Sequence, residues 1–444
     1  MKDSSAKAAT RQPAANVSTS RIKQQGMSTP RLHTRAILVV ALVARSLVLC
    51  YVIFQMPHAW LYSRGIEMGI LAQSLLMGRG LSSPFGGSTG PTALLSPGYP
   101  FFVAVFFRVF GAFTFEAAIA LMVAQLLCGV ATVLLIILIT RECFGALAAN
   151  VAGTFWAVSL PVIWMPTIFW ETSLSALLIL MMIALALRSE RRSNLVLWMT
   201  MGSISGIAAL VNPALLPSSL AIIGWMGFRS RKTLSYLPIL GVLVLLLIFT
   251  PWPIRNMRVL HAFIPLRSTI GYELWMGNRS GGAGFLDESL FPTFNRGEYN
   301  SYVSKGEVLY MRDKSLLAWT YICNHRTEFL RLTTVRVIRF WCGSGNKDGS
   351  PIFVLHALLT GCFGAFGLWQ LLEKKYFGIA ILFLLPVVLF PLPYYITHAE
   401  FRYRLIVDPI LTILAASSAA RWISSERSSH GRIEGQTVDD QDLV

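Results

Sequence analysis

Residues 36–56, AILVVALVARSLVLCYVIFQM, decide the class of this protein, because an apolar run of about 21 residues matches the ~30 Å hydrocarbon core of a bilayer. Similar runs recur along the chain. Only 14% of the 444 residues are charged and 54% are hydrophobic, whereas soluble domains carry about 25% charged residues. The composition excludes a soluble enzyme, a disordered protein and a disulfide scaffold.

The segment before this run, residues 1–35, holds seven Lys or Arg, one acid and no periodic apolar pattern. It is typical of a disordered cytoplasmic tail. Since 36–56 lacks a small-residue cleavage site, we expect an uncleaved first span with the N-terminus inside. Positive charge gathers on the cytoplasmic side of membrane proteins. The net charge of +16 therefore indicates topology and contact with membrane lipids, and we expect no nucleic-acid partner.

Nine further apolar runs predict an all-α polytopic protein with about ten transmembrane helices: 114–139, 144–163, 169–187, 195–211, 214–227, 233–252, 352–372, 376–395 and 404–422. Strict alternation then places the basic short loops inside, at Arg141, Arg188/Arg191/Arg192, Arg229/Arg231/Lys232, Lys374/Lys375 and Arg421/Arg427. This requires that 97–110, PGYPFFVAVFFRVF, stays outside as a juxtamembrane helix, because counting it as a span would invert every later loop.

The resulting organisation has five parts. Residues 1–35 form the tail, and 36–252 form an N-terminal transmembrane module whose first outer loop, 57–113, includes a short helix at about 65–77. A large outer loop at 253–351 precedes the C-terminal transmembrane helices at 352–423 and a cytoplasmic tail at 424–444. We expect a multi-pass protein of the cell inner (plasma) membrane with both termini in the cytoplasm.

Several polar residues leave alternatives open. Arg45 and Asp408 lie within predicted spans, where they either pair with each other or snorkel. Arginines interleave with apolar residues over 329–341, which predicts a helix along the outer headgroups, with its arginines toward anions or simply snorkelling. Cys323 and Cys342 are either free thiols or a pair.

A second set of ionisable residues lies near the predicted outer span ends or on the first outer loop, which favours chemistry at one membrane face over transport through the middle: His58, Glu67, Glu171, Arg255, His398, Glu400, Arg402 and Arg404. Glu67 lies on the short helix 65–77, where it is either a catalytic carboxylate at the interface or a solvated one. Arg402 and Arg404 precede the last span, and guanidinium groups match phosphate bidentately, although snorkelling also explains them.

Three stretches carry a family resemblance: 62–111, from YSRGIEMG to VFFRVFG; Pro251-Trp252 with Arg255-Asn256 and then IPLRSTIGYELWMGN at 264–278; and YYITHAEFRYRLIVDPIL at 394–411. Together they resemble bacterial membrane glycosyltransferases of the type-C fold. That group includes relatives of dolichyl-phosphate-mannose protein mannosyltransferases, lipid A aminoarabinose transferases and RgtA/B/C/D-like lipopolysaccharide sugar transferases.

The resemblance implies transfer of a monosaccharide from a polyprenyl-phosphate donor at the outer face, with inversion by single displacement. Glu67 takes the position of the family's general base, although many relatives have an Asp-Glu pair where this chain has one acid. Glu171 matches a second acid that in some relatives contacts the acceptor or a metal; a helix-start carboxylate is the alternative.

For the remaining site residues, the resemblance implies that Arg402, Arg404 and, more weakly, Arg255 bind the donor phosphate. Pro97, Gly98, Tyr99, His398 and Glu400 would shape the site. It leaves open whether the acceptor is a lipid, a glycan or a protein, and whether a divalent metal takes part as cofactor. The competing hypotheses are a polytopic lipid or solute transporter and an O-antigen ligase or polymerase that uses a diphosphate-linked glycan.

Overall fold

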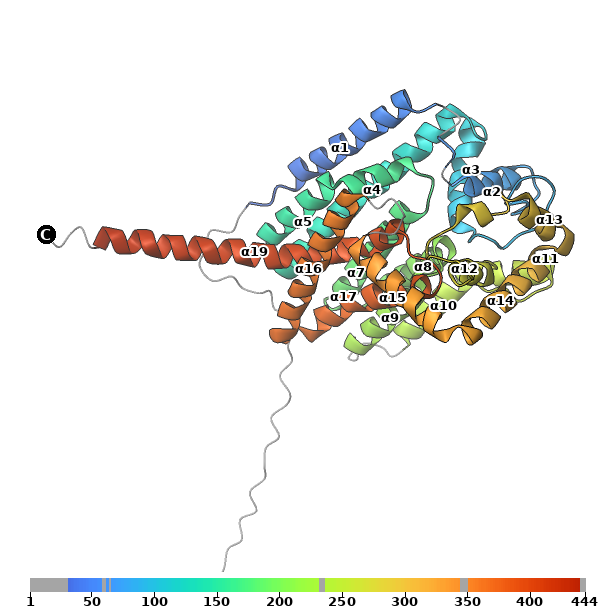
Figure 1. The fold of residues 1–444 in the computed structure, drawn as a ribbon. Helices are drawn as coiled ribbons and strands as arrows, with labels where there is room; N and C mark the ends of the chain where they lie inside the picture. The colour runs from blue at the N-terminus through green and yellow to red at the C-terminus, as the bar shows by residue number, and fades with distance from the viewer. Residues whose placement is uncertain (1–30, 58–60, 64, 231–235, 344–349, 440–444) are drawn as a thin grey trace, which may run out of the picture.

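The computed structural model describes residues 31–57, 61–63, 65–230, 236–343 and 350–439, with side chains described to Ile423. The expected tail at 1–30, Arg231, Lys232 and the side chains of the C-terminal tail lie outside the described residues. Across the described ranges the chain is helical, without a strand (Figure 1). The α-helices are α1 (Thr34–Gln55), α2 (Ile66–Leu76), α3 (Gly98–Phe110), α4 (Phe115–Phe144), α5 (Ala146–Val158), α6 (Leu160–Trp164), α7 (Thr172–Ser189), α8 (Leu195–Val211), α9 (Leu215–Arg229), α10 (Leu237–Phe249), α11 (Pro251–Leu260), α12 (Ile270–Gly277), α13 (Arg296–Lys305), α14 (Glu307–Asn324), α15 (Arg326–Cys342), α16 (Pro351–Glu373), α17 (Phe377–Leu389), α18 (Leu392–Ile396) and α19 (Phe401–Asp439).

Within the described ranges, seven helices are long and apolar enough to cross a membrane. They are α1, α4, α7, α10 continued by α11, α16, α17 continued by α18, and α19 up to Ile423. An eighth candidate is α5 followed by α6, which is bent by 54° at the break. The expected all-α polytopic membrane fold is confirmed.

The expected number of ten spans is higher than these helices support by length. Helices α8 and α9 occupy the predicted places, but their 17 and 15 residues extend only about 25 and 22 Å. Both are shorter than the ~30 Å core of a bilayer. Sequence runs of apolar residues therefore located both helices correctly and overestimated their reach.

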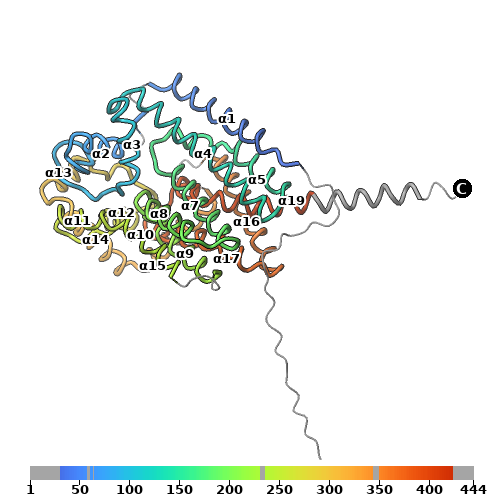
Figure 2. Tube along the Cα trace, turned by 180° about the vertical axis from the view of Figure 1, so that it is seen from behind, coloured from blue at the N-terminus to red at the C-terminus, as the bar shows by residue number. Residues whose placement is uncertain are grey.

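Helix α19 runs through the centre of the bundle, beside α16, α7 and α5 (Figures 1 and 2). Its close contact with α16 depends on Gly367, because a Cβ there would lie 2.2 Å from the Leu414 carbonyl oxygen. The pairing considered for Arg45 and Asp408 does not occur. Arg45 donates to the carbonyls of Trp156 and Ala157 instead.

Asp408 has its own partners inside the bundle. Arg404 Nε lies 3.1 Å from Asp408 Oδ1, and His356 Nε2 lies 3.1 Å from Asp408 Oδ2. All three side chains are buried. The ionisable groups of this part of the bundle therefore satisfy each other.

The region predicted as a large outer loop is mostly helical, from α11 to α15, and it packs on α2 and on the segment between α2 and α3. Glu307 fastens the two parts, because its carboxylate accepts hydrogen bonds from Thr92 Oγ1, from the Ala93 N–H (2.7 Å) and from Tyr302 Oη (2.7 Å). Glu307 is buried. It joins segments more than two hundred residues apart in the sequence.

The arginines of α15 do not line a surface for anions as a group. Arg336 is fully buried and donates to the backbone carbonyls of Gly277, Tyr395 and Ile396. Arg331 is exposed and pairs with Glu328 within the same helix. The interpretation of 329–341 as a headgroup-facing helix is therefore wrong for Arg336, which connects α12 to α18. All six cysteines, including Cys323 and Cys342, are unpaired.

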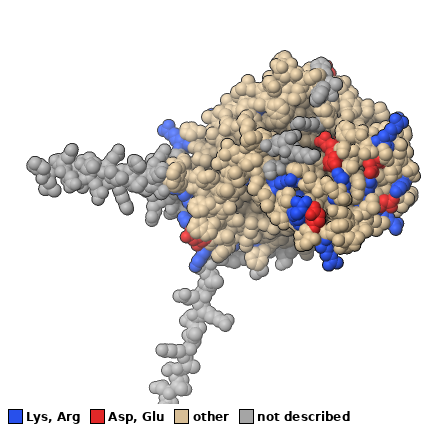
Figure 3. Space-filling view, viewed as in Figure 1, with Lys and Arg blue, Asp and Glu red and all other residues tan. Residues whose placement is uncertain are grey.

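Charged side chains gather toward the end of the molecule formed by α2 and α11 to α14, which belong to the part of the chain predicted to lie outside and called the outer region below (Figure 3). A smaller group lies at the opposite edge, and the surface between the two groups is largely uncharged. This distribution agrees with an apolar belt facing lipid. Which face is cytoplasmic stays a prediction from the basic loops.

We expect Arg192 and Lys374, both exposed, to lie inside and the exposed Ser304 of α13 to lie outside. Single cysteines at these positions in a cysteine-free variant, treated with a membrane-impermeant thiol reagent, test the topology. Intact cells should show labelling at Ser304→Cys only, and permeabilised cells at all three. Labelling of Arg192→Cys and Lys374→Cys in intact cells would invert the proposed orientation.

Candidate active site

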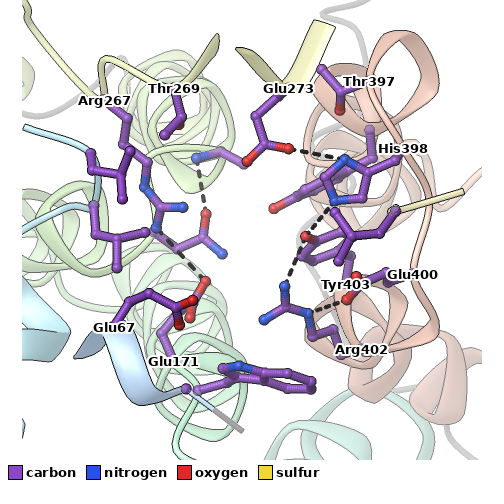
Figure 4. Close-up of a pocket in the computed structure, with 18 of the residues that line it drawn as sticks. Glu67, Glu171, Arg267, Thr269, Glu273, Thr397, His398, Glu400, Arg402 and Tyr403 are labelled. Atoms are coloured by element: carbon purple, nitrogen blue, oxygen red, sulfur yellow. Dashed lines mark hydrogen bonds and ion pairs between the residues drawn. The ribbon is translucent and has the colours of Figure 1, made fainter. Parts of the chain in front are cut away.

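A cavity of about 1150 Å³ lies where the outer region meets the ends of the bundle helices. Its polar walls come from α2, the residues before α7, α12 and the segment that leads into α19 (Figure 4). Phe353 at the start of α16 and Phe401 at the start of α19 also line it. The cavity therefore sits at one end of the apolar bundle and not at its middle.

Glu67 enters the cavity from the first turn of α2. The helix begins after Gly65, which has a φ of 89° and lies so close to Phe169 that a Cβ would come within 2.2 Å of its carbonyl oxygen. Only glycine suits that position. Burial raises the pKa of Glu67, and Glu288 adds to the rise, while its own backbone N–H and Arg402 oppose it. Such a carboxylate is suited to accept a proton.

Glu171 is the residue before α7 and is 5% exposed. Its Oε1 lies 3.8 Å from Nη2 of Arg267, and its Oε2 has no hydrogen-bond partner among the described residues. Arg267 also donates from Nε to Ser96 Oγ at 3.0 Å. The two acids, Glu67 and Glu171, thus share one wall of the cavity with a guanidinium (Figure 4).

Arg402 faces Glu67 across the cavity (Figure 4). Its guanidinium lies over the ring of Trp170, 3.9 Å from the centroid. Nε is ion-paired with Glu400, and Nη2 donates to Tyr403 Oη at 3.0 Å. A planar cation held on an aromatic face and by two partners keeps a fixed orientation.

His398 connects the two walls above Arg402. Its Nδ1 lies 2.9 Å from Oε2 of Glu273 on α12, and its Nε2 lies 3.0 Å from Tyr403 Oη. Although burial lowers the pKa of His398 and Arg402 lowers it further, Glu273 and Glu400 outweigh both and the pKa is raised. His398 and Glu400 therefore lie in the cavity, where they were expected.

The predicted site-shaping residues Pro97, Gly98 and Tyr99 lie beside the cavity and do not line it. Pro97 precedes α3, and a Cβ at Gly98 would lie 2.8 Å from the Leu210 carbonyl oxygen. Tyr99 donates to Gln125 Oε1 at 2.9 Å. Gln125 in turn donates to the backbone carbonyls at 166 and 168, which orders the chain just before Trp170 and Glu171.

Two predicted phosphate ligands are not at the cavity. Arg404 has no exposed surface and donates to the carbonyls of Trp341 (2.8 Å) and Ala357 (2.7 Å), besides its contact with Asp408. Helical periodicity explains this, because the side chain two residues after Arg402 points to another side of α19. Arg255 donates to the carbonyls of Leu81 and Thr92 and orders the first outer loop.

Four residues of the cavity were not singled out from the sequence: Trp170, Arg267, Glu273 and Tyr403. Arg267 and Glu273 lie within the stretch 264–278 that carries part of the family resemblance, and Tyr403 separates the two arginines that were chosen. The motifs therefore indicated which stretches of the chain form the site. The distances between side chains in the structure were needed to tell which residues of each stretch face the cavity.

No group of three His, Cys, Asp or Glu residues among those described could hold a metal ion. The unpaired Oε2 of Glu171 suits a cation, but Arg267 already places a positive charge 3.8 Å from the other oxygen. The described residues of the cavity therefore do not form a metal centre, and no chemical step is assigned to a metal.

Comparisons with known proteins agree with the membrane fold. Residues 94–254 match the family model of the dolichyl-phosphate-mannose-protein mannosyltransferases. No curated protein sequence matches the chain significantly.

Among solved structures, the oligosaccharyltransferase of Archaeoglobus fulgidus in its apo form has a TM-score of 0.53 at 14% identity, covering 90% of this chain and 52% of the other. The same enzyme in complex with Zn and sulfate has a TM-score of 0.50 at 13% identity, covering 86% and 48%. The chain thus spans about half the length of that enzyme. ArnT from Cupriavidus metallidurans bound to undecaprenyl phosphate has a TM-score of 0.36 at 15% identity, covering 88% and 78%.

The family match and the fold shared with the archaeal enzyme confirm the type-C glycosyltransferase fold that the motifs implied. The chain is a multi-pass membrane protein of this fold.

Proposed function

We propose that this protein is a glycosyltransferase that moves a monosaccharide from a polyprenyl-phosphate carrier to an acceptor at the outer face of the inner membrane. The observation that carries the proposal is the placement of Glu67 and Arg402 on opposite walls of one cavity at the end of the bundle. A lipid donor held by its chain among the helices brings its phosphate to this level. The acceptor is a lipid, a glycan or a protein.

In the proposed step, Glu67 takes the proton of an acceptor hydroxyl while the oxygen of that hydroxyl attacks the anomeric carbon of the sugar. The bond from that carbon to the phosphate oxygen breaks, and its electron pair leaves with the polyprenyl phosphate. One displacement inverts the anomeric configuration. The raised pKa of Glu67 makes it a stronger base than an exposed glutamate, as general-base catalysis near neutral pH requires.

Arg402 is suited to hold the phosphate. A guanidinium carries five N–H donors, of which Nε engages Glu400 and one N–H of Nη2 engages Tyr403. Three donors remain for an anion. Arg267 supplies a second positive charge at the wall that carries Glu171, and together the two cations would stabilise the charge that develops on the departing phosphate.

The transporter hypothesis has less support, because the buried Arg404, Asp408 and His356 satisfy each other inside the bundle. A carrier needs ionisable groups on a pathway through the membrane. The ligase hypothesis shares the cavity chemistry and differs in the donor, which would be a diphosphate-linked glycan.

Incubating the purified protein with a panel of lipid-linked sugars tests the proposal. The panel contains polyprenyl-monophosphate sugars and diphosphate-linked glycans, each with lipid, glycan and peptide acceptors. We expect release of polyprenyl phosphate together with glycosylated acceptor from a monophosphate donor. Turnover of the diphosphate donors alone would support the ligase hypothesis, and no turnover of any donor would contradict both.

Arg402→Ala is expected to raise the donor KM by roughly 10- to 100-fold, since one charge-assisted phosphate contact is worth about 1.5–3 kcal/mol. Transfer rates measured with the donor below saturation check this. Arg258→Ala, which removes an exposed cation of α11 outside the cavity, is the matched comparison. Wild-type turnover by Arg402→Ala under these conditions would exclude the phosphate role.

A further inference from the structure

A continuous chain of polar side chains joins the outer region to Arg402. It runs from Glu273 to His398 (2.9 Å), from His398 to Tyr403 (3.0 Å) and from Tyr403 to Arg402 (3.0 Å) (Figure 4). All four side chains line the cavity. His398 and Tyr403 are 3% and 8% exposed, so bulk water does not replace these contacts.

The hydroxyl of Tyr403 has one proton, and its neighbours decide where that proton points. Arg402 can only donate, so the Tyr403 oxygen accepts the bond from Nη2. If His398 is neutral with its proton on the nitrogen beside Glu273, Nε2 is an acceptor and the Tyr403 hydroxyl donates to it. If His398 is charged, Nε2–H donates to the Tyr403 oxygen. The hydroxyl of Tyr403 keeps its proton but no longer donates it to His398, so it is available to a ligand in the cavity.

The charges around His398 favour its charged form. Glu273 faces it from α12, Glu400 from the segment before α19, and Arg402 from α19 with the opposite effect. Burial tends to raise the pKa of Glu273, but His398, Arg267 and Arg402 outweigh it, so its pKa is lowered and the carboxylate stays ionised. The pKa of His398 is raised. His398 is thus charged in a pH range where an exposed histidine is neutral.

The geometry points to Tyr403 as a second hydrogen-bond donor to the phosphate of the lipid donor, beside Arg402, with Glu273 and charged His398 as the positioning residues that free its proton. This inference rests on the proposed function. Donor affinity should be highest below the pKa of His398 and should fall as pH rises through it, because deprotonation returns the Tyr403 proton to Nε2. Glu273→Gln removes a charge that raises this pKa, so the fall should move to lower pH.

Equilibrium binding of farnesyl methyl phosphate to the purified protein in detergent tests this. The probe is a phosphodiester whose own charge is constant over pH 5–9, so its titration does not contribute. We expect Tyr403→Phe to weaken binding by about 10-fold at the acidic end and to abolish the pH dependence, since a hydrogen bond to a charged group is worth about 1.5–3 kcal/mol. Tyr395→Phe is the control, because the Tyr395 hydroxyl bonds Trp341 outside the cavity.

The outcomes separate this inference from the proposed function. Wild-type protein that does not bind the probe at any pH contradicts the proposed donor class. If Tyr403→Phe binds the probe as tightly as the wild type does and with the same pH dependence, the role of Tyr403 is overturned and the proposed function stays intact. If Tyr403→Phe does not fold, Glu273→Gln still decides: a pH midpoint equal to that of the wild type overturns the inference.

Discussion

Replacing Glu67 by Gln is expected to lower the rate of sugar transfer by roughly 10²–10⁴-fold, the usual contribution of a general base. Glutamine keeps the shape of the side chain but cannot accept the proton. Donor binding should survive, because the phosphate contacts assigned to Arg402 are unchanged. Single-turnover transfer at saturating donor measures the chemical step directly.

The pH profile provides a second measure of the same residue. Since the pKa of Glu67 is raised from 4.5, the wild-type rate should fall with decreasing pH at values above 4.5, as the carboxylate becomes protonated. Glu171→Gln is the comparison, because that acid shares the same wall. If Glu171→Gln loses transfer while Glu67→Gln retains it, the base is Glu171 and the assignment from the first outer loop is wrong.

Arg404→Leu is expected to destabilise the protein by about 3–5 kcal/mol, because it leaves Asp408 charged and buried without its guanidinium partner. Arg402→Leu, two residues earlier, should affect donor use far more than stability, since Arg402 lines the cavity and Arg404 does not. The two variants are compared by heating each in detergent and measuring by size-exclusion chromatography how much of the monodisperse peak remains at each temperature.

The double variant Arg404→Leu with Asp408→Leu isolates the cause. Replacing both members of a buried pair by apolar side chains is usually far milder than removing one. Partial recovery of the unfolding temperature in the double variant would identify the unpaired charge as the source of the loss. A single variant as stable as the wild type would show that Arg404 is not needed for the bundle.

The sequence predicted the positions of the helices better than it predicted which side chains contact each other. The interfacial helix expected at 65–77 is α2, and the apolar stretch 97–110 is α3, because run length and periodicity are local properties of the chain. Helix length was harder to judge, because α8 and α9 lie where apolar runs predicted spans but have only 17 and 15 residues. A helix end depends on tertiary packing as well as on composition.

Arginine shows why the site was only partly predictable. Arg402 reaches the cavity, Arg404 binds buried carbonyls and Arg336 joins α12 to α18, although all three are basic residues flanked by apolar ones. A sequence pattern indicates that such a residue lies near the outer boundary. Whether it meets solvent, lipid or protein depends on segments distant in the chain, as with Trp170 beneath Arg402.

The cavity is assembled from segments that lie far apart in the sequence. Its walls are therefore synthesised at different times during translation. Glu67 is translated 335 residues before Arg402 (402 − 67), an interval of roughly 20–70 s at 5–20 residues per second. During that time the nascent chain has its carboxylate wall but lacks the cation that faces it. A chain that stops before the last helix therefore lacks this cation, and we expect the proposed transfer only after that helix has been inserted.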